Sequence, residues 1–164
     1  MITVLMGAPG AGKTTWVRNN AQNEVILSSE AVRIYKTDLD IGSFMDGLRV
    51  KGFKAVKEGK SIIVDATNTI QAHRLYWLKV SKLTRMPNRL IVFNTPLTHL
   101  LQAQTIREFP AADTIVKEHY RRLNRSLNTI KIEGWDEIEI IDRLSNRCSI
   151  VKKRDLNRTF NETT

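Results

Sequence analysis

The sequence predicts a single α/β domain in which helices flank a parallel sheet. Its 164 residues are about the length of one domain. Five short runs of apolar and β-branched residues alternate along the chain with longer segments that favour helix, an alternation typical of a parallel sheet. Two of these runs, at 61–65 and 89–94, are almost continuously apolar, which suits strands buried on both faces.

The elements follow one another without a repeat or a linker. Residues 1–6 form a strand that stops at a glycine, and residues 13–22 form a helix with Trp16 and Val17 on its inner face. A strand at 25–27 ends at two serines, and residues 30–36 favour the start of a helix. The other predicted helices span 43–57, 70–84, 97–106 and 111–130, and the other strands span 61–65, 89–94 and 137–141. We expect residues 1–142 to form the domain and residues 143–164 to form a basic, partly disordered tail.

The chain is strongly basic, with a formal net charge of +9. The excess is regional, since residues 70–89 contain five basic residues and no acidic one, and residues 143–164 contain six against two. A field of this kind attracts polyanions, so we expect a nucleic acid, DNA or RNA, as partner. The alternative to a nucleic-acid partner is that these lysines and arginines are surface charges solvated by water and bind no polyanion.

Composition also restricts the compartment. No apolar run approaches the roughly 18 residues of a membrane-spanning helix, and the first residues lack the basic region of a signal peptide. Cys148 is the only cysteine, so no intrachain disulfide is possible. We expect a cytoplasmic protein, acting in the host cytoplasm if it is phage-encoded, and its oligomeric state stays open.

The loop between the first strand and the first helix matches the pattern G-x-x-x-x-G-K-[ST] in full. Its glycines let backbone N–H groups turn inward, and these groups form an anion cradle with the helix N-terminus. The lysine of such a loop reaches the β- and γ-phosphates of a nucleoside triphosphate, and the hydroxyl ligates Mg²⁺. We therefore expect ATP, or another nucleoside triphosphate, and Mg²⁺ to bind at Gly7, Ala8, Pro9, Gly10, Ala11, Gly12, Lys13, Thr14 and Thr15.

Asp65 is the candidate for the acidic group that supports the metal ion. It ends the third predicted strand, which lies beside the first strand in this kind of sheet, so its carboxylate can face the phosphate loop. We expect a hydrogen bond to Thr14 or to a water on Mg²⁺. An aspartate that caps the next helix is the alternative.

Other residues favour a kinase over other nucleotide-binding proteins. The sequence has no N-K-x-D motif, with which a switch GTPase reads its base. A kinase needs a carboxylate near the acceptor hydroxyl and cations for the transferred charge. Glu30 and Arg33 share one face of a helical turn after the second strand, where they suit proton acceptance and the binding of an acceptor phosphate. Asp38 and Asp40 are rival bases, and Arg107 is a candidate lid arginine. The alternatives are structural: Glu30 would cap the start of a helix, and Arg33 and Arg107 would be solvated surface charges.

Together, residues 7–14, 28–33 and 64–68, with Arg107 and Pro110, resemble the 5′-kinase domain of polynucleotide kinases of the phage and bacterial repair type. The resemblance spans about residues 1–142. It implies an adenylate-kinase-like P-loop fold with a helical lid, and transfer of the γ-phosphate to a 5′-hydroxyl of DNA or RNA. It also implies that Lys13 and Thr14 hold ATP and Mg²⁺, that Glu30 is the general base, that Arg33 grips a 3′-phosphate of the acceptor, and that Arg107 contacts the ATP phosphates. By the same resemblance, Asn68 lines the acceptor or nucleotide site.

Two departures from that family leave the acceptor open. The family's base is usually aspartate, and the extra methylene of Glu30 moves the carboxylate by roughly 1.5 Å, which matters for near-attack geometry. A second lid arginine of some relatives falls near Phe109 here. The alternatives are a kinase for a hydroxymethylated base such as 5-hydroxymethyluracil in DNA, a small-molecule kinase for a nucleoside, sugar or antibiotic, and a nucleotide-binding protein without phosphotransfer.

Overall fold

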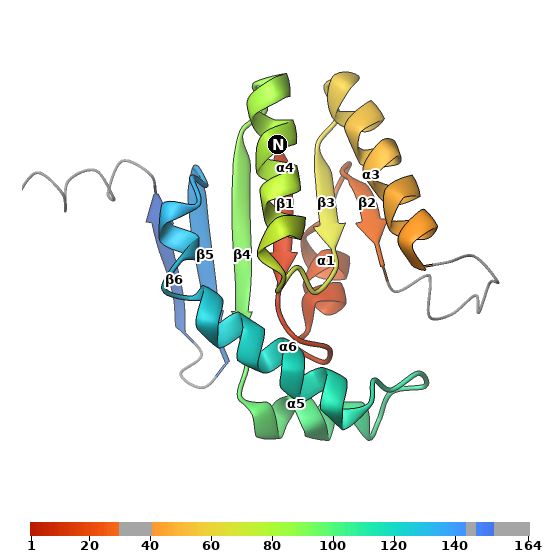
Figure 1. Cartoon of the computed structure of the whole chain (residues 1–164), viewed down its shortest axis with the longest axis vertical. Helices are drawn as coiled ribbons and strands as arrows, with labels where there is room; N and C mark the ends of the chain where they lie inside the picture. Colours follow the sequence, from red (N-terminus) through yellow and green to blue (C-terminus); the bar gives the residue numbers. More distant parts are fainter. Residues whose placement is uncertain (30–40, 144–146, 153–164) are drawn as a thin grey trace, which may run out of the picture.

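The computed structural model describes residues 1–29, 41–143 and 147–152. Within them, six strands form one sheet in the order β2-β3-β1-β4-β5-β6 (Figure 1). The first five strands in sequence are parallel, and the sixth is antiparallel to β5. Their bounds are β1 Ile2–Met6, β2 Val25–Ser28, β3 Ile62–Asp65, β4 Asn88–Asn94, β5 Glu137–Asp142 and β6 Arg147–Lys152.

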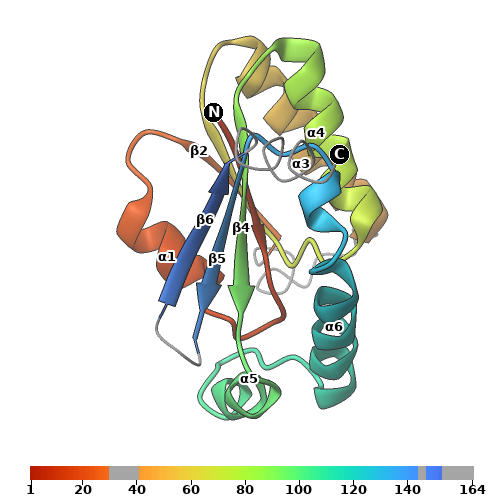
Figure 2. The same cartoon turned by 90° about the vertical axis from the view of Figure 1, so that its left-hand side faces the viewer.

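Helices cover both faces of the sheet. Figure 2 shows α1 on one face and α3, α4 and α6 on the other, with α5 beyond the carboxyl end of β4. The helices are α1 Lys13–Asn20, α3 Ile41–Lys57, α4 Gln71–Thr84, α5 Leu97–Gln104 and α6 Asp113–Ser126, followed by a 3-10 turn, η1, at Ile130–Ile132. The layers and the order of the strands are those of the P-loop kinase fold.

Two hydrophobic clusters lie on opposite faces of the sheet because side chains along a strand alternate in direction. Val4 packs in the cluster that includes Trp77 and Leu78 of α4. Its neighbour Leu5 packs in the cluster that includes Val17 of α1 and Leu100 of α5. The central strand β1 is buried along its whole length, as its position between two layers requires.

In the described residues the predicted elements are confirmed apart from their ends, and the antiparallel strand β6 was not predicted. The helix start predicted at 30–36 lies outside the described residues. The sequence placed residues 147–152 in a polar tail, and in the structure they extend the sheet beyond β5. Their pattern carried little signal because β6 is an edge strand, on which Ser149 and Ile150 are both exposed. Among the described residues, every helix is too short or too polar to cross a bilayer.

The basic run at 70–89 does not form one surface. Arg74 is completely buried. Arg89 lies toward α1, where it donates a hydrogen bond to Thr3 at 3.1 Å and its guanidinium lies 5.6 Å from the centre of the Trp16 ring. Only the three remaining cations of this run, Lys79, Lys82 and Arg85, are exposed. The regional charge therefore supports a polyanion-binding face less strongly than the sequence suggested.

Candidate active site

The phosphate loop leaves the carboxyl end of β1 and leads directly into α1. Gly10 and Gly12 have φ values of 88° and 89°, which glycine adopts at little cost. At Gly10 a Cβ would lie 2.6 Å from Nε2 of Gln104 and 3.1 Å from the carbonyl oxygen of Leu100, so the packing leaves no room for a side chain. At Gly12 a Cβ would meet only the flexible guanidinium end of Arg143. Backbone conformation therefore favours glycine at both positions, and close packing adds to this at Gly10.

Lys13 curls back over this loop. Its ammonium donates hydrogen bonds to the carbonyl oxygens of Gly7 at 2.9 Å and Ala8 at 3.0 Å. The residue is 8% exposed. A buried ammonium is costly without anionic or carbonyl partners, so the loop holds a positive charge at the place where an anion would enter.

Thr14 and Asp65 meet at the carboxyl edge of the sheet. The Thr14 hydroxyl donates to Oδ2 of Asp65 at 2.9 Å, the hydrogen bond that the sequence predicted. Asp65 ends β3, which pairs directly with β1, and it is 4% exposed. The two side chains present a hydroxyl and a carboxylate, the hard oxygen donors that Mg²⁺ prefers, so this pair fits a magnesium ion.

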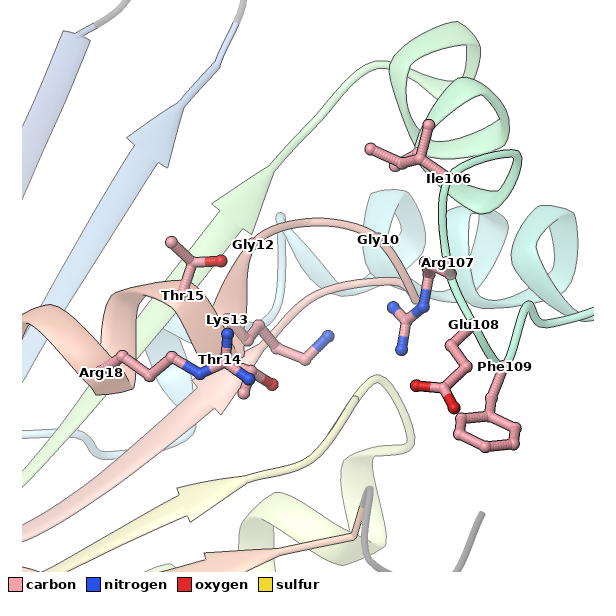
Figure 3. Close-up of a pocket in the computed structure, with 11 residues that line it drawn as sticks. Gly10, Gly12, Lys13, Thr14, Thr15, Arg18, Ile106, Arg107, Glu108 and Phe109 are labelled. Atoms are coloured by element: carbon pink, nitrogen blue, oxygen red, sulfur yellow. The ribbon is translucent and has the colours of Figure 1, made fainter. Parts of the chain in front are cut away.

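A cavity of about 510 Å³ opens between the phosphate loop and the segment that joins α5 to α6. Figure 3 shows the Lys13 ammonium and the Arg107 guanidinium pointing toward one another across it. A smaller hollow of about 50 Å³ adjoins Lys13, Thr14, Asp65 and Arg107. The first cavity is lined by Gly10, Gly12, Lys13, Thr14, Thr15, Arg18, Ala103, Ile106, Arg107, Glu108 and Phe109. The size and lining of these spaces suit a nucleotide whose phosphates lie over the loop.

Gln104 joins the phosphate loop to the segment that carries Arg107. Its Nε2 donates to the carbonyl oxygens of Pro9 at 3.1 Å and Leu100 at 3.0 Å. Its Oε1 accepts the backbone N–H of Ala111 at 3.0 Å. The residue is 6% exposed, so its polar atoms are fully committed. Gln104 was not predicted, since a single glutamine at the end of an amphipathic helix gives no signal in the sequence.

Arg143 is a second residue that the sequence did not assign to the site. The prediction counted it with the basic tail, but its guanidinium lies against Gly12. Its backbone N–H bonds to the carbonyl of Asn94 at the end of β4, at 3.1 Å. This bond fixes the turn after β5 beside the phosphate loop, so Arg143 adds positive charge to the same edge of the sheet.

Asn68 stabilises the turn that follows β3, and its place in the acceptor or nucleotide site stays a prediction. Its side-chain nitrogen donates to the carbonyl oxygen of Leu5 at 2.7 Å, and the residue is 2% exposed. Its φ of 45° is uncommon for a residue other than glycine. The amide therefore stabilises a tight turn after β3 and connects it to β1.

The predicted base and acceptor-binding residues lie outside the described part of the chain. This applies to Glu30, Arg33, Asp38 and Asp40. Ser29, the last described residue before them, donates its backbone N–H to the carbonyl of Asp65 at 3.0 Å and borders the smaller hollow.

Comparison with known proteins gives the family of the chain and its fold. The sequence profile described as an AAA domain matches residues 2–129. No curated protein matches the sequence of the chain.

Three solved structures have a similar fold over nearly the whole chain. One, from Chloroflexus aurantiacus and named only provisionally as a kinase, has a TM-score of 0.63 at 13% identity and covers 99% of this chain and 98% of its own. Deoxyadenosine kinase from M. mycoides with bound dATP has a TM-score of 0.55 at 15% identity, with 99% and 98% covered. A gluconokinase from Sinorhizobium meliloti has a TM-score of 0.55 at 9% identity, with 99% and 97% covered. At these identities the likeness is one of fold.

Proposed function

Because this chain belongs to the AAA domain family, we propose that it is a kinase that transfers the γ-phosphate of ATP, or of another nucleoside triphosphate, to a hydroxyl group. The observation that carries the proposal is the convergence of Lys13, the Thr14–Asp65 pair and Arg107 on adjoining cavities at one edge of the sheet. Cations and an oxygen-rich metal site around one phosphate group are what phosphoryl transfer needs.

Each residue has a specific role in this proposal. On nucleotide binding, the Lys13 ammonium exchanges the loop carbonyls for phosphate oxygens, and Arg107 neutralises charge on the γ-phosphate. Thr14 directly, and Asp65 through water, would hold Mg²⁺, which when bound neutralises charge on the β- and γ-phosphates. Arg107 and its neighbours line the cavity and would also exclude water from it once the site is filled.

By the resemblance, Glu30 accepts the proton of the acceptor hydroxyl while its oxygen attacks the γ-phosphorus. The bond from that phosphorus to the bridging oxygen breaks, and the nucleoside diphosphate leaves. Arg33 holds a phosphate of the acceptor. Both residues lie outside the described part of the chain, so this half of the mechanism rests on the sequence.

The acceptor that we propose first is nucleic acid, most specifically the 5′-hydroxyl of a polynucleotide. The net charge of +9 and the motif resemblance support it, as do the exposed Arg121 and Arg125 on α6. A 5-hydroxymethyluracil base in DNA would use the same machinery.

A small-molecule acceptor is the second candidate, and one observation favours it. Arg74 is completely buried and Arg89 is half-buried, which reduces the basic area available to a polyanion. The fold is also shared with a deoxyadenosine kinase and a gluconokinase. Nucleotide binding without phosphotransfer is the remaining alternative.

An acceptor screen with γ-labelled ATP and Mg²⁺ tests these proposals. The first acceptor is an oligonucleotide with a free 5′-hydroxyl. The second is a 5′-phosphorylated oligonucleotide in which one base is 5-hydroxymethyluracil. The third and fourth are the small molecules deoxyadenosine and gluconate. We expect label on the first. Label on the second alone would assign the modified base, and label only on a small molecule would remove the nucleic-acid proposal. Nucleotide binding without transfer to any acceptor would contradict the kinase proposal.

Two variants control the screen. Lys13→Met should lower transfer at least about 100-fold, because it removes a preorganised cation from the transferred phosphate. Lys60→Met is the matched control, since Lys60 is exposed and precedes β3 at the opposite edge of the sheet. Equal activity of the two variants would point to a contaminating kinase. Acceptor binding should weaken steeply with salt for a nucleic acid and little for gluconate.

A further inference from the structure

A completely buried ion pair lies behind the site. The side chains of Arg74 on α4 and Glu133 after η1 are 0% and 2% exposed. Arg74 donates from Nη2 to Oε1 of Glu133 at 2.6 Å and from Nε to Oε2 at 3.1 Å. The Trp135 indole N–H donates to the same carboxylate at 3.0 Å. The carboxylate is therefore well paired, in a place where the removal of one partner would be costly.

Such a pair is weak grounds for stability alone. The cost of removing two charges from water often equals or exceeds their attraction, and apolar replacements of similar volume are often neutral or stabilising. The remaining group of this guanidinium points to another role, because Nη1 of Arg74 donates to the backbone carbonyl of Asn68 at 2.9 Å.

Asn68 is the residue of the loop between β3 and α4 that has a left-handed backbone. Its φ is 45°, a conformation that asparagine adopts more readily than other non-glycine residues, and contacts on both sides hold it in place. The side chain is held by the carbonyl of Leu5 at the end of β1, and the carbonyl is held by Arg74. The turn is thus fixed from both sides.

This turn forms one wall of the phosphate loop. The carbonyl oxygen of Thr67 accepts the backbone N–H of Gly7 at 2.9 Å, and the loop begins at Asp65, which binds Thr14. Figure 1 shows the β3–α4 loop beside the loop that joins β1 to α1. Displacement of Asn68 would therefore reach Gly7, the first residue of the phosphate loop, and Asp65, the hydrogen-bond partner of Thr14, together.

We propose that Arg74, held by Glu133, is a positioning residue for the nucleotide site. It sets the β3–α4 loop through Asn68, and that loop sets Gly7 and Asp65. The part of this proposal that concerns Mg·ATP rests on the proposed function. The part that concerns the loop stands on the structure alone.

The test is the double variant Arg74→Met with Glu133→Gln. It leaves no unpaired buried charge, keeps an oxygen for the Trp135 N–H, and removes the bond to Asn68. The matched control is Asn88→Ala. Asn88 is buried and bonds to Ser81 at 2.8 Å and Asp136 at 3.1 Å, at the start of β4 and so at the opposite edge of the sheet. The control loses buried hydrogen bonds without touching the site.

The first readout is amide hydrogen exchange in the nucleotide-free protein. Exchange of the Gly7 N–H, relative to that of Ile91 in the core of β4, should accelerate at least tenfold in the double variant and stay within twofold in Asn88→Ala. Equal acceleration of both amides would mean that the pair only stabilises the fold, and would overturn the proposal. Because no ligand is added, this arm gives a result whatever the protein binds.

The second readout is the dissociation constant for Mg·ATP, measured with a fluorescent analogue. We expect at least a tenfold weakening in the double variant and less than a twofold change in the control. Unchanged affinity in the double variant would overturn the role at the nucleotide site. Neither readout requires phosphate transfer, so a wild-type protein that binds Mg·ATP and phosphorylates nothing would contradict the proposed kinase activity and leave this inference intact.

Discussion

Gln104→Met should loosen the phosphate loop from the segment that carries Arg107. Methionine keeps the length of the side chain but has no strong donor or acceptor. The change removes the bonds to the carbonyls of Pro9 and Leu100 and the bond from the N–H of Ala111. Pro9 belongs to the phosphate loop, and Ala111 follows the segment that lines the cavity, so both walls lose their connection.

The expected size follows from these three bonds. At about 1 kcal/mol each they contribute about 3 kcal/mol. Water can reach the half-buried Ala111 and replaces part of the lost hydrogen bonding. The free energy of unfolding should therefore fall by roughly 2 kcal/mol. At about 2–4 °C per kcal/mol for a chain of this size, Tm should fall by roughly 4–8 °C. The freed phosphate loop should also bind Mg·ATP about tenfold more weakly, which corresponds to about 1.4 kcal/mol.

Thermal unfolding and a fluorescent ATP analogue measure the two effects. Gln102→Met is the matched control, because Gln102 lies on the same helix and is exposed, and it should change neither quantity. An unchanged nucleotide affinity in Gln104→Met, with the expected loss of Tm, would refute the coupling and reduce Gln104 to a core residue. A change of neither quantity would show that its hydrogen bonds are replaced at no cost.

Three further changes test the site and its surroundings. Asp65→Asn removes the negative charge of the carboxylate that would hold Mg²⁺ through water, so the Mg²⁺ concentration for half-maximal nucleotide binding should rise at least about tenfold while Thr14 keeps a hydrogen-bond partner; an unchanged Mg²⁺ titration would contradict the metal role. Gly12→Ala forces a side chain into a φ of 89° and should destabilise the fold by about 1–2 kcal/mol and abolish most nucleotide binding; normal affinity for the ATP analogue would show that the loop tolerates a Cβ. Burial and three nearby arginines lower the pKa of His73 from its ordinary value of 6.5. The unfolded chain therefore takes up a proton at higher pH than the folded chain does. Protonation of His73 consequently lowers the free energy of unfolding as the pH falls below its ordinary pKa of 6.5, and this effect is lost as the pH rises above that value. The loss of Tm between about pH 7.5 and about pH 5.5 should be smaller in His73→Asn than in wild type, whereas the exposed His99, replaced in the same way, should leave it unchanged; equal losses in all three proteins would reject His73 as a source.

Two arginines near the site, Arg74 and Arg143, were not identified from the sequence, and the reasons differ. Arg74 was read as part of a basic run, although it lies on the same helical face as the buried Trp77, Leu78 and Ser81. That spacing of i, i+3, i+4 and i+7 was the signal available for its burial. Arg143 gave no such signal, because its contact with Gly12 depends on where the turn after β5 lies in space.

The amino-acid sequence by itself determined the alternation of strands and helices, the phosphate loop between β1 and α1, and the acid at the end of β3. These features depend on residues that are neighbours in the chain, whose backbone preferences and spacing act locally. The sequence also anticipated that Asp65 would meet Thr14, 51 residues away. Only the tertiary structure decided which other distant groups meet: the side chains of Arg74 and Glu133, 59 residues apart, and the side chain of Gln104 with the backbone of Pro9, 95 residues apart. The physical reason is that a buried polar group must find a partner wherever the strand order places one, and the strand order is a property of the whole packed sheet rather than of any segment.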